Sequence, residues 1–219
     1  MLFSWKSSAV VLAATFVFVT LPPAASHADE PIRLFDGETL NGWSDGRGGW
    51  EVVDGTLASV AGQYVALYAD GEYADFALSF EFRLTPGANN GVALRAPGDG
   101  DPAYVGMESQ ILDNPAPRYA SLEGYQYHGS IYGVVAAKRG ALRETGEWNE
   151  QRIVCRGRRV VVELNGTTIV DADLDEAAPG GRTLDSKPHP GLMRSSGKIG
   201  LLGHADRVFF RNLTIVRLD

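Results

Sequence analysis

Phe76-Ala-Leu-Ser-Phe-Glu-Phe-Arg-Leu84 decides the fold, because apolar and polar side chains alternate along it with a period of two. This alternation is typical of a β-strand with one face in a core and the other in water or a cleft. The apolar face would leave a large exposed patch if it stayed in water. We therefore expect five side chains to be buried between two packed sheets: Phe76, Leu78, Phe80, Phe82 and Leu84.

Short alternating runs and turn signals continue in both directions from this strand. Asp54-Gly55 and Asn165-Gly166 each separate two such runs, and dipeptides of this kind favour the tight turn of a β-hairpin. No segment has the pattern of a long amphipathic helix. The sequence thus predicts an all-β fold, a two-sheet antiparallel β-sandwich or jelly roll. The further strand candidates are Val65–Tyr68, Gly91–Arg95, Gly106–Leu112, Gln151–Arg156, Ile199–Leu202 and Val208–Arg217.

Two regions are expected to form long loops, Ala96–Val105 and Ala172–Lys198. Loops of this length are usually functional or mobile. The second contains Lys187-Pro188-His189-Pro190, and we expect it to form one wall of a cleft.

The first 28 residues have the three parts of a signal peptide. Lys6 precedes an apolar run over residues 9–21, and Ser26-His27-Ala28 has the small residues of a cleavage site. The run is shorter than the roughly 20 apolar residues that span a bilayer. We expect cleavage before Asp29, a secreted or periplasmic protein with no membrane span, and one domain over residues 29–219.

Composition excludes several functional classes. A net charge of −7 without basic clusters argues against nucleic acid and anionic membrane surfaces as partners. The single cysteine, Cys155, lies in a strand-like run and is expected to be a buried, inert thiol. The sequence has no P-loop, no glycine-rich dinucleotide fingerprint, no G-x-S-x-G and no H-E-x-x-H, so nucleotide-binding, serine hydrolase and zincin functions have no basis.

The densest polar chemistry lies in Gly106-Met-Glu-Ser-Gln-Ile-Leu-Asp-Asn114. In a strand, Glu108 and Gln110 share one face and Asp113 lies at the end. Arg95, like Glu81 and Arg83, also opposes the apolar face of its own strand. Neighbouring strands would combine these groups into a platform for sugar hydroxyls. Any antiparallel sheet with one solvated face shows the same alternation, so periodicity alone favours a solvated face over catalysis.

Several motifs follow one another along nearly all of residues 29–219. They are Leu34-Phe-Asp-Gly-Glu-Thr-Leu-Asn-Gly-Trp43, Asn90-Gly-Val-Ala-Leu-Arg95, Glu108-Ser-Gln-Ile-Leu-Asp-Asn114, Gly129-Ser-Ile-Tyr-Gly133, Gly146-Glu-Trp-Asn-Glu150, Leu164-Asn-Gly166, Gly200–His204 and Val208-Phe-Phe-Arg-Asn212. In this order they resemble the 3-keto-disaccharide hydrolase domain family, formerly a domain of unknown function. The resemblance implies a concanavalin-like jelly roll that cleaves 3-keto-glycosides. The sequence departs from the family pattern at Leu202-Gly203, where a polar pair often precedes the histidine.

The implied reaction begins at the carbon next to the ketone. A C3 ketone acidifies the C2 hydrogen, so that a base can form an enolate and the C1 oxygen can leave, with water adding afterwards. The resemblance makes Glu108 the base or a metal ligand and His204 an acid, base or ligand. Arg95 would stabilise the enolate oxygen or bind a hydroxyl group. Gln110 would orient the substrate. Further substrate contacts are assigned to Asp113, His128 and Tyr132. A divalent metal ion held by Glu108 and His204 is a further expectation, since oxygen and imidazole ligands suit several metals.

Two other functions compete with this interpretation. A carbohydrate-binding, lectin-like module without catalysis can use the same fold. Such a module would be expected to depend more on exposed aromatic residues than on Glu108, Arg95 and His204 together. An ordinary two-carboxylate glycosidase would pair Glu108 with Glu81 or Asp113, and the separation of the carboxyl groups would reveal it.

Overall fold

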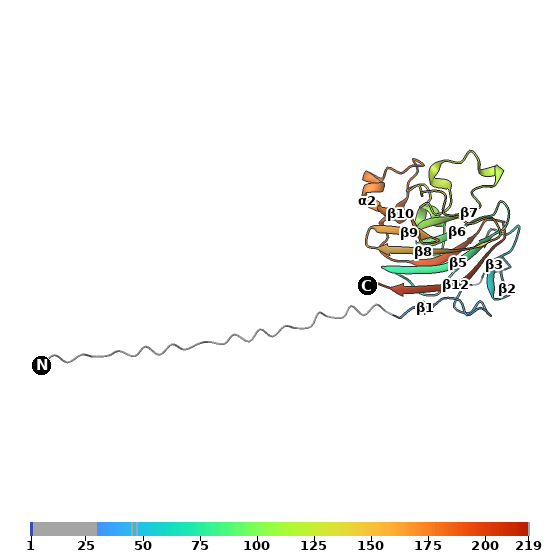
Figure 1. The fold of residues 1–219 in the computed structure, drawn as a ribbon, viewed down its shortest axis with the longest axis horizontal. Helices are drawn as coiled ribbons and strands as arrows, with labels where there is room; N and C mark the ends of the chain where they lie inside the picture. The colour runs from blue at the N-terminus through green and yellow to red at the C-terminus, as the bar shows by residue number, and fades with distance from the viewer. Residues whose placement is uncertain (2–29, 45, 47, 219) are drawn as a thin grey trace.

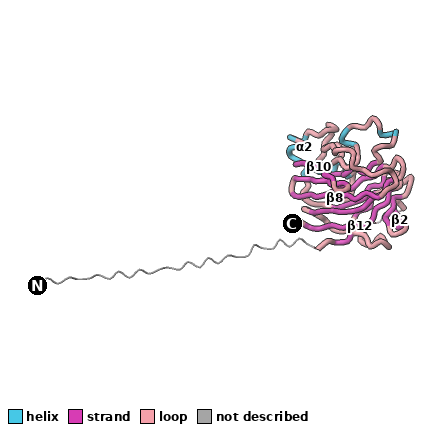
Figure 2. Tube along the Cα trace, viewed as in Figure 1, coloured by secondary structure: helices cyan, strands magenta, loops and turns pink. Residues whose placement is uncertain are grey.

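Two antiparallel sheets dominate the protein, as the ribbon and the trace coloured by secondary structure show (Figures 1 and 2). A computed structural model describes residues 1, 30–44, 46 and 48–218. The expected signal peptide, apart from Met1, and its cleavage site before Asp29 lie outside these residues. The strands are β1 (Ile32–Arg33), β2 (Trp50–Val53), β3 (Thr56–Ser59), β4 (Ala66–Tyr68), β5 (Phe76–Leu84), β6 (Asn89–Ala96), β7 (Met107–Leu112), β8 (Trp148–Arg156), β9 (Arg159–Leu164), β10 (Thr167–Asp173), β11 (Lys198–Gly203) and β12 (Val208–Arg217).

The larger sheet has eight strands and the smaller has four. The larger follows the order β10-β9-β8-β5-β12-β3-β2, with β1 paired to β12, and the smaller follows β4-β11-β6-β7. Figure 1 shows β10, β9, β8, β5 and β12 side by side in one layer. The order within each sheet brings together strands far apart in the sequence, and all pairs are antiparallel. This architecture confirms the predicted all-β, two-sheet sandwich.

The core lies between the sheets and is built by strand alternation. In β5 the five predicted side chains are all buried, whereas Ser79, Glu81 and Arg83 are partly exposed. β12 pairs with β5 and contributes Phe210 opposite Phe82. Cys155 of β8 is fully buried, and burial raises the pKa of its thiol to about 12. The expectation of a buried cysteine is therefore confirmed.

The two predicted hairpins are present. Asp54-Gly55 joins β2 to β3 and Asn165-Gly166 joins β9 to β10. All four residues have positive φ, as the two central positions of a type I′ turn require. The turn residues therefore fix where these strands reverse.

Short helices occupy the connections, and both expected long loops contain them. In the part of the chain that the structure describes, no helix is long and apolar enough to cross a membrane. The helices are α1 (Pro102–Val105), α2 (Leu174–Ala177) and the 3-10 turns η1 (Pro117–Tyr119), η2 (Gly124–Gln126), η3 (Pro179–Gly181) and η4 (Pro190–Met193). η4 packs on α1, so the two long loops meet each other beside the start of β7.

Candidate functional site

A short segment extends the smaller sheet beyond β7. Ser109 and Ile131 form an antiparallel bridge, and the Tyr132 amide donates a hydrogen bond to the Glu108 carbonyl at 2.9 Å. Ile131 and Ser109 are both completely buried. Their neighbours Tyr132 and Glu108 therefore face one another on the outer side of the sheet, where directly opposed side chains lie about 4.5–5.5 Å apart at Cβ.

Small residues form the outer surface between the two edges of this sheet. The register places Tyr68, Gly200, Ala93 and Glu108 in one row across β4, β11, β6 and β7. Gly91 lies next to this row, and a Cβ there would overlap the Glu108 carboxyl. Likewise a Cβ at Gly200 would overlap the Tyr68 ring. Because these glycines have no Cβ, the Glu108 carboxyl group can pack against the backbone at Gly91 and the Tyr68 ring against the backbone at Gly200.

Glu108 and His204 contact each other on this outer face of the smaller sheet. His204 follows the last residue of β11, and its alternation with the outward-facing Leu202 directs it to the same side. The distance between His204 Nε2 and Glu108 Oε1 is 3.6 Å. Glu108 is only 5 % exposed, whereas the His204 side chain is 36 % exposed. The pair therefore joins a nearly buried carboxylate to an imidazole that solvent reaches.

The surroundings of His204 favour its protonated form. Burial acts to lower the pKa of His204, but the contact with Glu108 and the charges of Asp101 and Asp206 outweigh it. The pKa of His204 therefore lies above its ordinary value. An imidazolium beside a carboxylate is a proton donor next to a proton acceptor, which is the pairing that general acid–base chemistry requires.

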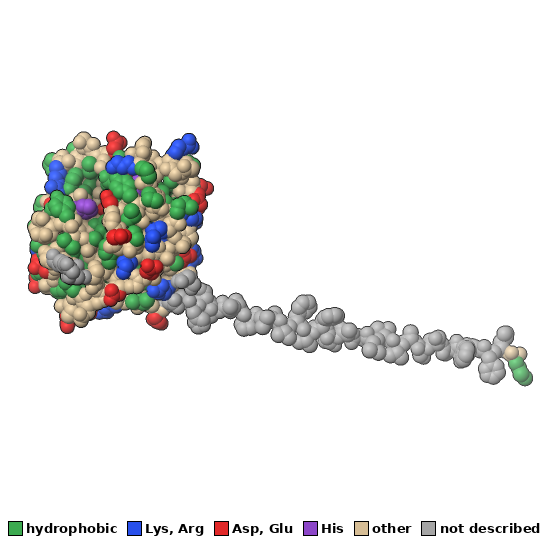
Figure 3. Space-filling view, turned by 180° about the vertical axis from the view of Figure 1, so that it is seen from behind, with side chains coloured by type: hydrophobic (Ala, Val, Ile, Leu, Met, Phe, Trp, Pro, Cys, Tyr) green, Lys and Arg blue, Asp and Glu red, His purple; other side chains and the backbone are tan. Residues whose placement is uncertain are grey.

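Tyr132 faces Glu108, and Tyr68 lies on the same outer surface at the opposite edge of the sheet. Burial raises the pKa of the Tyr132 phenol, and the neighbouring Tyr104, Glu108 and Tyr125 raise it further, while the hydrogen bond from Gln126 acts in the opposite direction. The Tyr68 phenol also has a raised pKa, because of burial and then of Asp99 and Asp101. Both phenols are therefore neutral hydroxyl groups at neutral pH. Seen from behind, the protein surface shows a histidine beside acidic and apolar side chains (Figure 3).

Gln110 lies where its sequence position predicts. It is two residues after Glu108 in β7 and directly opposite Gly91. Its side chain is 5 % exposed, and its Oε1 accepts a hydrogen bond from the Ile111 amide at 3.1 Å. The structure therefore brings together Glu108, Gln110, Tyr132 and His204 among the residues that the sequence selected.

Arg95 does not join them, and its expected placement is wrong. Its Nε donates to Ala74 O at 2.9 Å, Nη1 to Gly157 O at 2.8 Å and Nη2 to Asp75 Oδ1 at 3.1 Å. These partners flank β5 and the turn after β8, at the end of the larger sheet. Arg95 is 1 % exposed, so its guanidinium is a buried tie between the two layers.

A β-bulge is the physical reason for this difference. Ala93 pairs with Gly200 and Ala96 pairs with Lys198, so two residues of β6 stand opposite one residue of β11. Arg95 has a φ of 49°. The extra residue turns the Arg95 side chain inward and returns Ala96 to the outer face, where it packs with Ala93. Strict alternation would have placed Arg95 beside Ala93 instead.

His128 is a core residue and not part of the outer face. Its Nδ1 accepts a hydrogen bond from the Leu112 amide, and Nε2 lies 2.9 Å from Gln151 Oε1. Its ring stacks on Phe82 with centroids 5.0 Å apart. Burial lowers the pKa of His128 to about 3, against an opposing hydrogen bond to Gln151. The predicted substrate contact is contradicted, because a neutral, fully buried imidazole has both nitrogens occupied.

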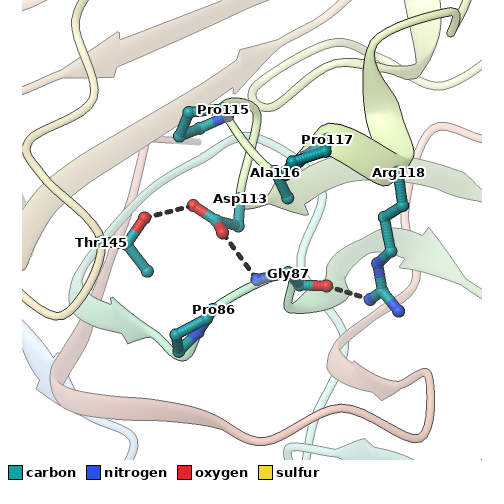
Figure 4. A pocket seen from close by; sticks show the side chains of 8 residues that line it. All are labelled: Pro86, Gly87, Asp113, Pro115, Ala116, Pro117, Arg118 and Thr145. Atoms are coloured by element: carbon teal, nitrogen blue, oxygen red, sulfur yellow. Dashed lines mark hydrogen bonds between the residues drawn. The ribbon is translucent and has the colours of Figure 1, made fainter.

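Asp113 holds two loops together away from Glu108. Its Oδ2 accepts the Gly87 amide at 2.6 Å and its Oδ1 accepts the Thr145 hydroxyl at 2.6 Å (Figure 4). It borders a hollow of about 420 Å³ whose lining includes Pro86, Pro115 and Pro117. Asp113 is 4 % exposed, and both of its oxygens are engaged by the protein. The expected role as a substrate contact is therefore not supported by its position.

The two-carboxylate alternative also meets a geometric obstacle. Glu81 lies on the outer face of the larger sheet, where Arg211 and Asn212 bind its carboxyl group. Glu108 lies on the outer face of the other sheet, so the core separates the two carboxyl groups. In the described part of the chain, no group of three or more His, Cys, Asp or Glu side chains has a metal-binding arrangement. Glu108 and His204 are two ligand candidates for the expected divalent ion.

The structure adds three residues to this neighbourhood that the sequence did not single out. Tyr68 and Tyr104 contribute phenols, and Lys187 Nζ donates to Tyr104 Oη at 2.9 Å. Tyr68 had a usable signal, since it alternates with the buried Leu67 in a short strand. Lys187 belongs to the loop that was expected to form a cleft wall, but nothing in its local sequence connects it with Tyr104.

Comparisons with known proteins agree with the family resemblance of the motifs. A family model described as "3-keto-alpha-glucoside-1,2-lyase-like domain" matches residues 30–216. A protein of Bacteroides thetaiotaomicron named 3-keto-disaccharide hydrolase is 27 % identical to this chain. The alignment covers 88 % of this chain and 80 % of that protein.

Solved structures agree with the fold. A putative glycosyl hydrolase from Parabacteroides distasonis is 28 % identical, with a TM-score of 0.77 over 87 % of this chain and 100 % of that one. A second from the same organism is 23 % identical, with a TM-score of 0.75 over 86 % and 94 % of the two chains. A carbohydrate-binding module from Bacillus subtilis is 13 % identical, with a TM-score of 0.52 over 80 % and 94 %, and this likeness concerns the fold alone.

Proposed function

Because this chain belongs to the 3-keto-α-glucoside-1,2-lyase-like family, we propose that it is an enzyme that cleaves the glycosidic bond of 3-keto-disaccharides. The observation that supports this proposal most directly is the Glu108–His204 pair on the outer face of the smaller sheet. The 3-keto-disaccharide hydrolase named among its relatives supports the substrate class.

The proposed reaction begins with removal of the C2 proton. The C2–H bond breaks, the proton passes to the Glu108 carboxylate, and the electron pair forms an enolate whose charge lies on the C3 oxygen. The C1–O bond then breaks as the C1=C2 double bond forms, and His204 supplies a proton to the departing oxygen. Addition of water to the C1=C2 bond completes a net hydrolysis.

The environment of each group suits its proposed role. Glu108 is nearly buried, and its Oε1 lies 3.6 Å from His204 Nε2, so the proposed base and the proposed acid are adjacent. His204 has a raised pKa and a partly exposed ring, so it can be protonated and can recover a proton from solvent. General acid–base groups at such positions contribute about 10²–10⁴-fold each to a rate.

Tyr132 and Gln110 are the proposed substrate-orienting groups. Tyr132 stands opposite Glu108 across the sheet, and its phenol can donate a hydrogen bond to a sugar oxygen. Gln110 is the next outward residue of β7, and its amide can donate to a hydroxyl group. Arg95, His128 and Asp113 have no place in this proposal because their polar atoms are bound elsewhere.

The ketone supplies a sharp test of this function. The purified protein is incubated with a 3-keto-disaccharide and with its unoxidised parent, with and without a chelator, in deuterated water. We expect cleavage of the keto compound alone and deuterium at C2 of recovered substrate or product. An ordinary sugar C2 hydrogen is too weakly acidic for a carboxylate to remove.

Other outcomes would identify a different function. Equal turnover of the parent disaccharide would favour an ordinary glycosidase, and sugar binding without turnover would favour the lectin-like module. Loss of activity in the chelator arm alone would show that a divalent metal ion is required.

Export of the protein is a separate proposal. The signal-peptide pattern of residues 1–28 supports cleavage before Asp29 and a secreted or periplasmic location. N-terminal sequencing of protein collected outside the cytoplasm should begin at Asp29. Recovery of chains that still begin at Met1 would contradict it.

A further inference from the structure

We propose that the Lys187 ammonium group, positioned by Tyr104, binds the C3 oxygen of the substrate and stabilises the enolate. This inference rests on the proposed function and supplies the cationic group that Arg95 was expected to provide. Because Arg95 is buried between the layers, the charge on the enolate oxygen needs another partner. An electrophile directed at developing charge is usually the largest single contribution to such a reaction.

The backbone of Lys187 is fixed on both sides. Its amide donates to Asp185 Oδ1 at 3.0 Å, and its carbonyl accepts a hydrogen bond from the Thr183 hydroxyl at 2.8 Å. The same hydroxyl oxygen lies 3.0 Å from Asp185 Oδ1. The loop is therefore closed around Asp185, with Lys187 at a defined position on its exposed side.

A buried contact between His189 and Asp185 anchors this loop. His189 Nε2 lies 3.1 Å from Asp185 Oδ1, and Nδ1 lies 3.0 Å from Ala103 O. Both ring nitrogens therefore lie within hydrogen-bond distance of oxygen atoms of the protein. The two side chains are 1 % and 4 % exposed. Separating these buried polar groups would leave them without hydrogen-bond partners, and this cost keeps the loop in one arrangement.

The loop is joined to the strand segment that carries Tyr132. Leu184 and Asp185 both donate their amides to the Gly133 carbonyl, at 2.8 and 3.2 Å. A Cβ at Gly133 would meet Asp185 and His189 at 2.7 Å, so only glycine allows this approach. Tyr132, the preceding residue, faces Glu108. A short chain of contacts therefore links the position of Lys187 to the catalytic carboxylate.

Tyr104 sets the direction of the ammonium group. It lies in α1, just before β7, and its ring packs against His189 with centroids 4.8 Å apart. Its phenol accepts one hydrogen from Lys187 Nζ at 2.9 Å. An ammonium group has three donors, so two remain for a ligand. Tyr104 raises the pKa of Lys187 through this hydrogen bond, and Tyr132 adds a smaller effect, which places both phenols near the cation.

The proposed assignment separates the charges that the reaction needs. Glu108 accepts the C2 proton, His204 donates a proton to the C1 oxygen, and Lys187 donates a hydrogen bond to the C3 oxygen as its negative charge develops. Lys187 keeps its proton throughout, so the proton balance of the reaction is unchanged. A ketone is what distinguishes this substrate from an ordinary disaccharide, and Lys187 would be the residue that recognises it.

Lys187→Met tests this role, with Lys138→Met as the control. Met keeps the length of the side chain and removes the charge, and Lys138 is an exposed lysine beside β10. We expect kcat on the 3-keto-disaccharide to fall about 10²–10³-fold, as for removal of one oxyanion donor. Exchange of the C2 hydrogen with deuterated water should fall by the same factor, because the enolate itself is destabilised. Tyr104→Phe should give a smaller loss, and the lysine control should retain wild-type values.

The outcomes distinguish this inference from the proposed function. If the wild-type protein cleaves no 3-keto-disaccharide, the proposed function itself fails. If it does and Lys187→Met retains the wild-type kcat, the inference about Lys187 is wrong while the function stands. Slower cleavage with unchanged C2 exchange would also overturn it, because Lys187 would then act on the leaving group. An unchanged melting temperature in the Lys187→Met variant confirms that any loss is not due to unfolding.

Discussion

On the outer face of the larger sheet, acidic side chains lie against arginines, whereas on the outer face of the smaller sheet Glu108 lies against a histidine. Glu81 is bound by Arg211 at 2.6 Å, and Glu163 by Arg152 at 3.3 Å. Arginine stays charged at every physiological pH, so these pairs are static. Histidine exchanges its proton near neutral pH. Two faces with the same alternating pattern therefore differ in whether a proton can move.

Burial separates the two faces further. Glu81 and Glu163 are partly open to solvent, where an ion pair contributes about 0–1 kcal/mol. Glu108 is 5 % exposed, and a glycine in the next strand makes room for its carboxyl group. A carboxyl group that is nearly buried on the outer face of a sheet needs a reason in packing or in chemistry. The contrast supports the proposal that the outer face of the smaller sheet carries the catalytic groups.

The largest difference in kcat is expected between substitutions of the two carboxylates, Glu108 on the smaller sheet and Glu81 on the larger sheet. Glu108→Gln removes the proposed base and should lower kcat on a 3-keto-disaccharide about 10²–10⁴-fold. Glu81→Gln removes a carboxylate of the other face and should leave kcat within about twofold, since exposed pairs contribute little. Steady-state kinetics of both variants provide the measurement. Similar losses in the two variants would show that the faces are not functionally distinct.

The pH dependence of His204 gives the next largest effect. Its pKa is raised in the folded protein, so the charged pair with Glu108 is complete below the ordinary value of 6.5 and is lost as the pH rises through the higher folded value. Activity that needs the imidazolium should fall on the same alkaline side. His204→Gln should lower kcat about 10²-fold or more and remove this alkaline limb from the pH–rate profile. An unchanged limb in the variant would assign it to another group.

The raised pKa of His204 also makes the stability of the folded protein depend on pH. A group whose pKa is raised on folding stabilises the protein at low pH and loses that contribution as pH rises. The arginine pairs of the larger sheet have no corresponding step near neutral pH. Denaturation midpoints of wild type and His204→Gln, measured from pH 5 to 9, should therefore converge toward the alkaline end.

A smaller loss is expected from crowding Glu108 without removing it. In Gly91→Ala the added Cβ overlaps the carboxyl group, which must move. A displacement of about 1 Å at a reacting group costs on the order of 10²-fold in rate or less. Gly124→Ala is the control, because its Cβ would meet only the Ala136 methyl group at 3.5 Å. Wild-type kinetics in the Gly91 variant would contradict the proposed position of the base.

Substitution of Arg95 is expected to have the smallest effect on kcat but a large effect on the stability of the fold. Arg95→Met leaves Ala74 O, Gly157 O and Asp75 without their shared donor, and breaking a buried charged network costs about 3–5 kcal/mol. Urea denaturation should show this loss, while kcat per folded molecule stays near wild type. A stable variant with a strongly reduced kcat would show that Arg95 takes part in catalysis after all.

The sequence by itself determined the features that depend on local geometry. Alternation in β5 fixed which side faces the core, because successive side chains of a strand point to opposite faces. The same rule put Glu108 and Gln110 on one outer face of β7. Asn165-Gly166 fixed a hairpin because its residues tolerate positive φ. The ordered motifs also identified the family.

Only the tertiary structure decided where Arg95, His128 and Lys187 lie. One extra residue in β6 reverses the face of Arg95, and a bulge is set by pairing with β11, about 100 residues later in the chain. His128 enters the core because the segment after β7 folds back over that strand. Lys187 meets Tyr104 because a buried contact between Asp185 and His189 fixes its loop beside α1. The position of each of these side chains depends on contacts between segments that are distant in the sequence. The residues next to it in the sequence do not determine those contacts.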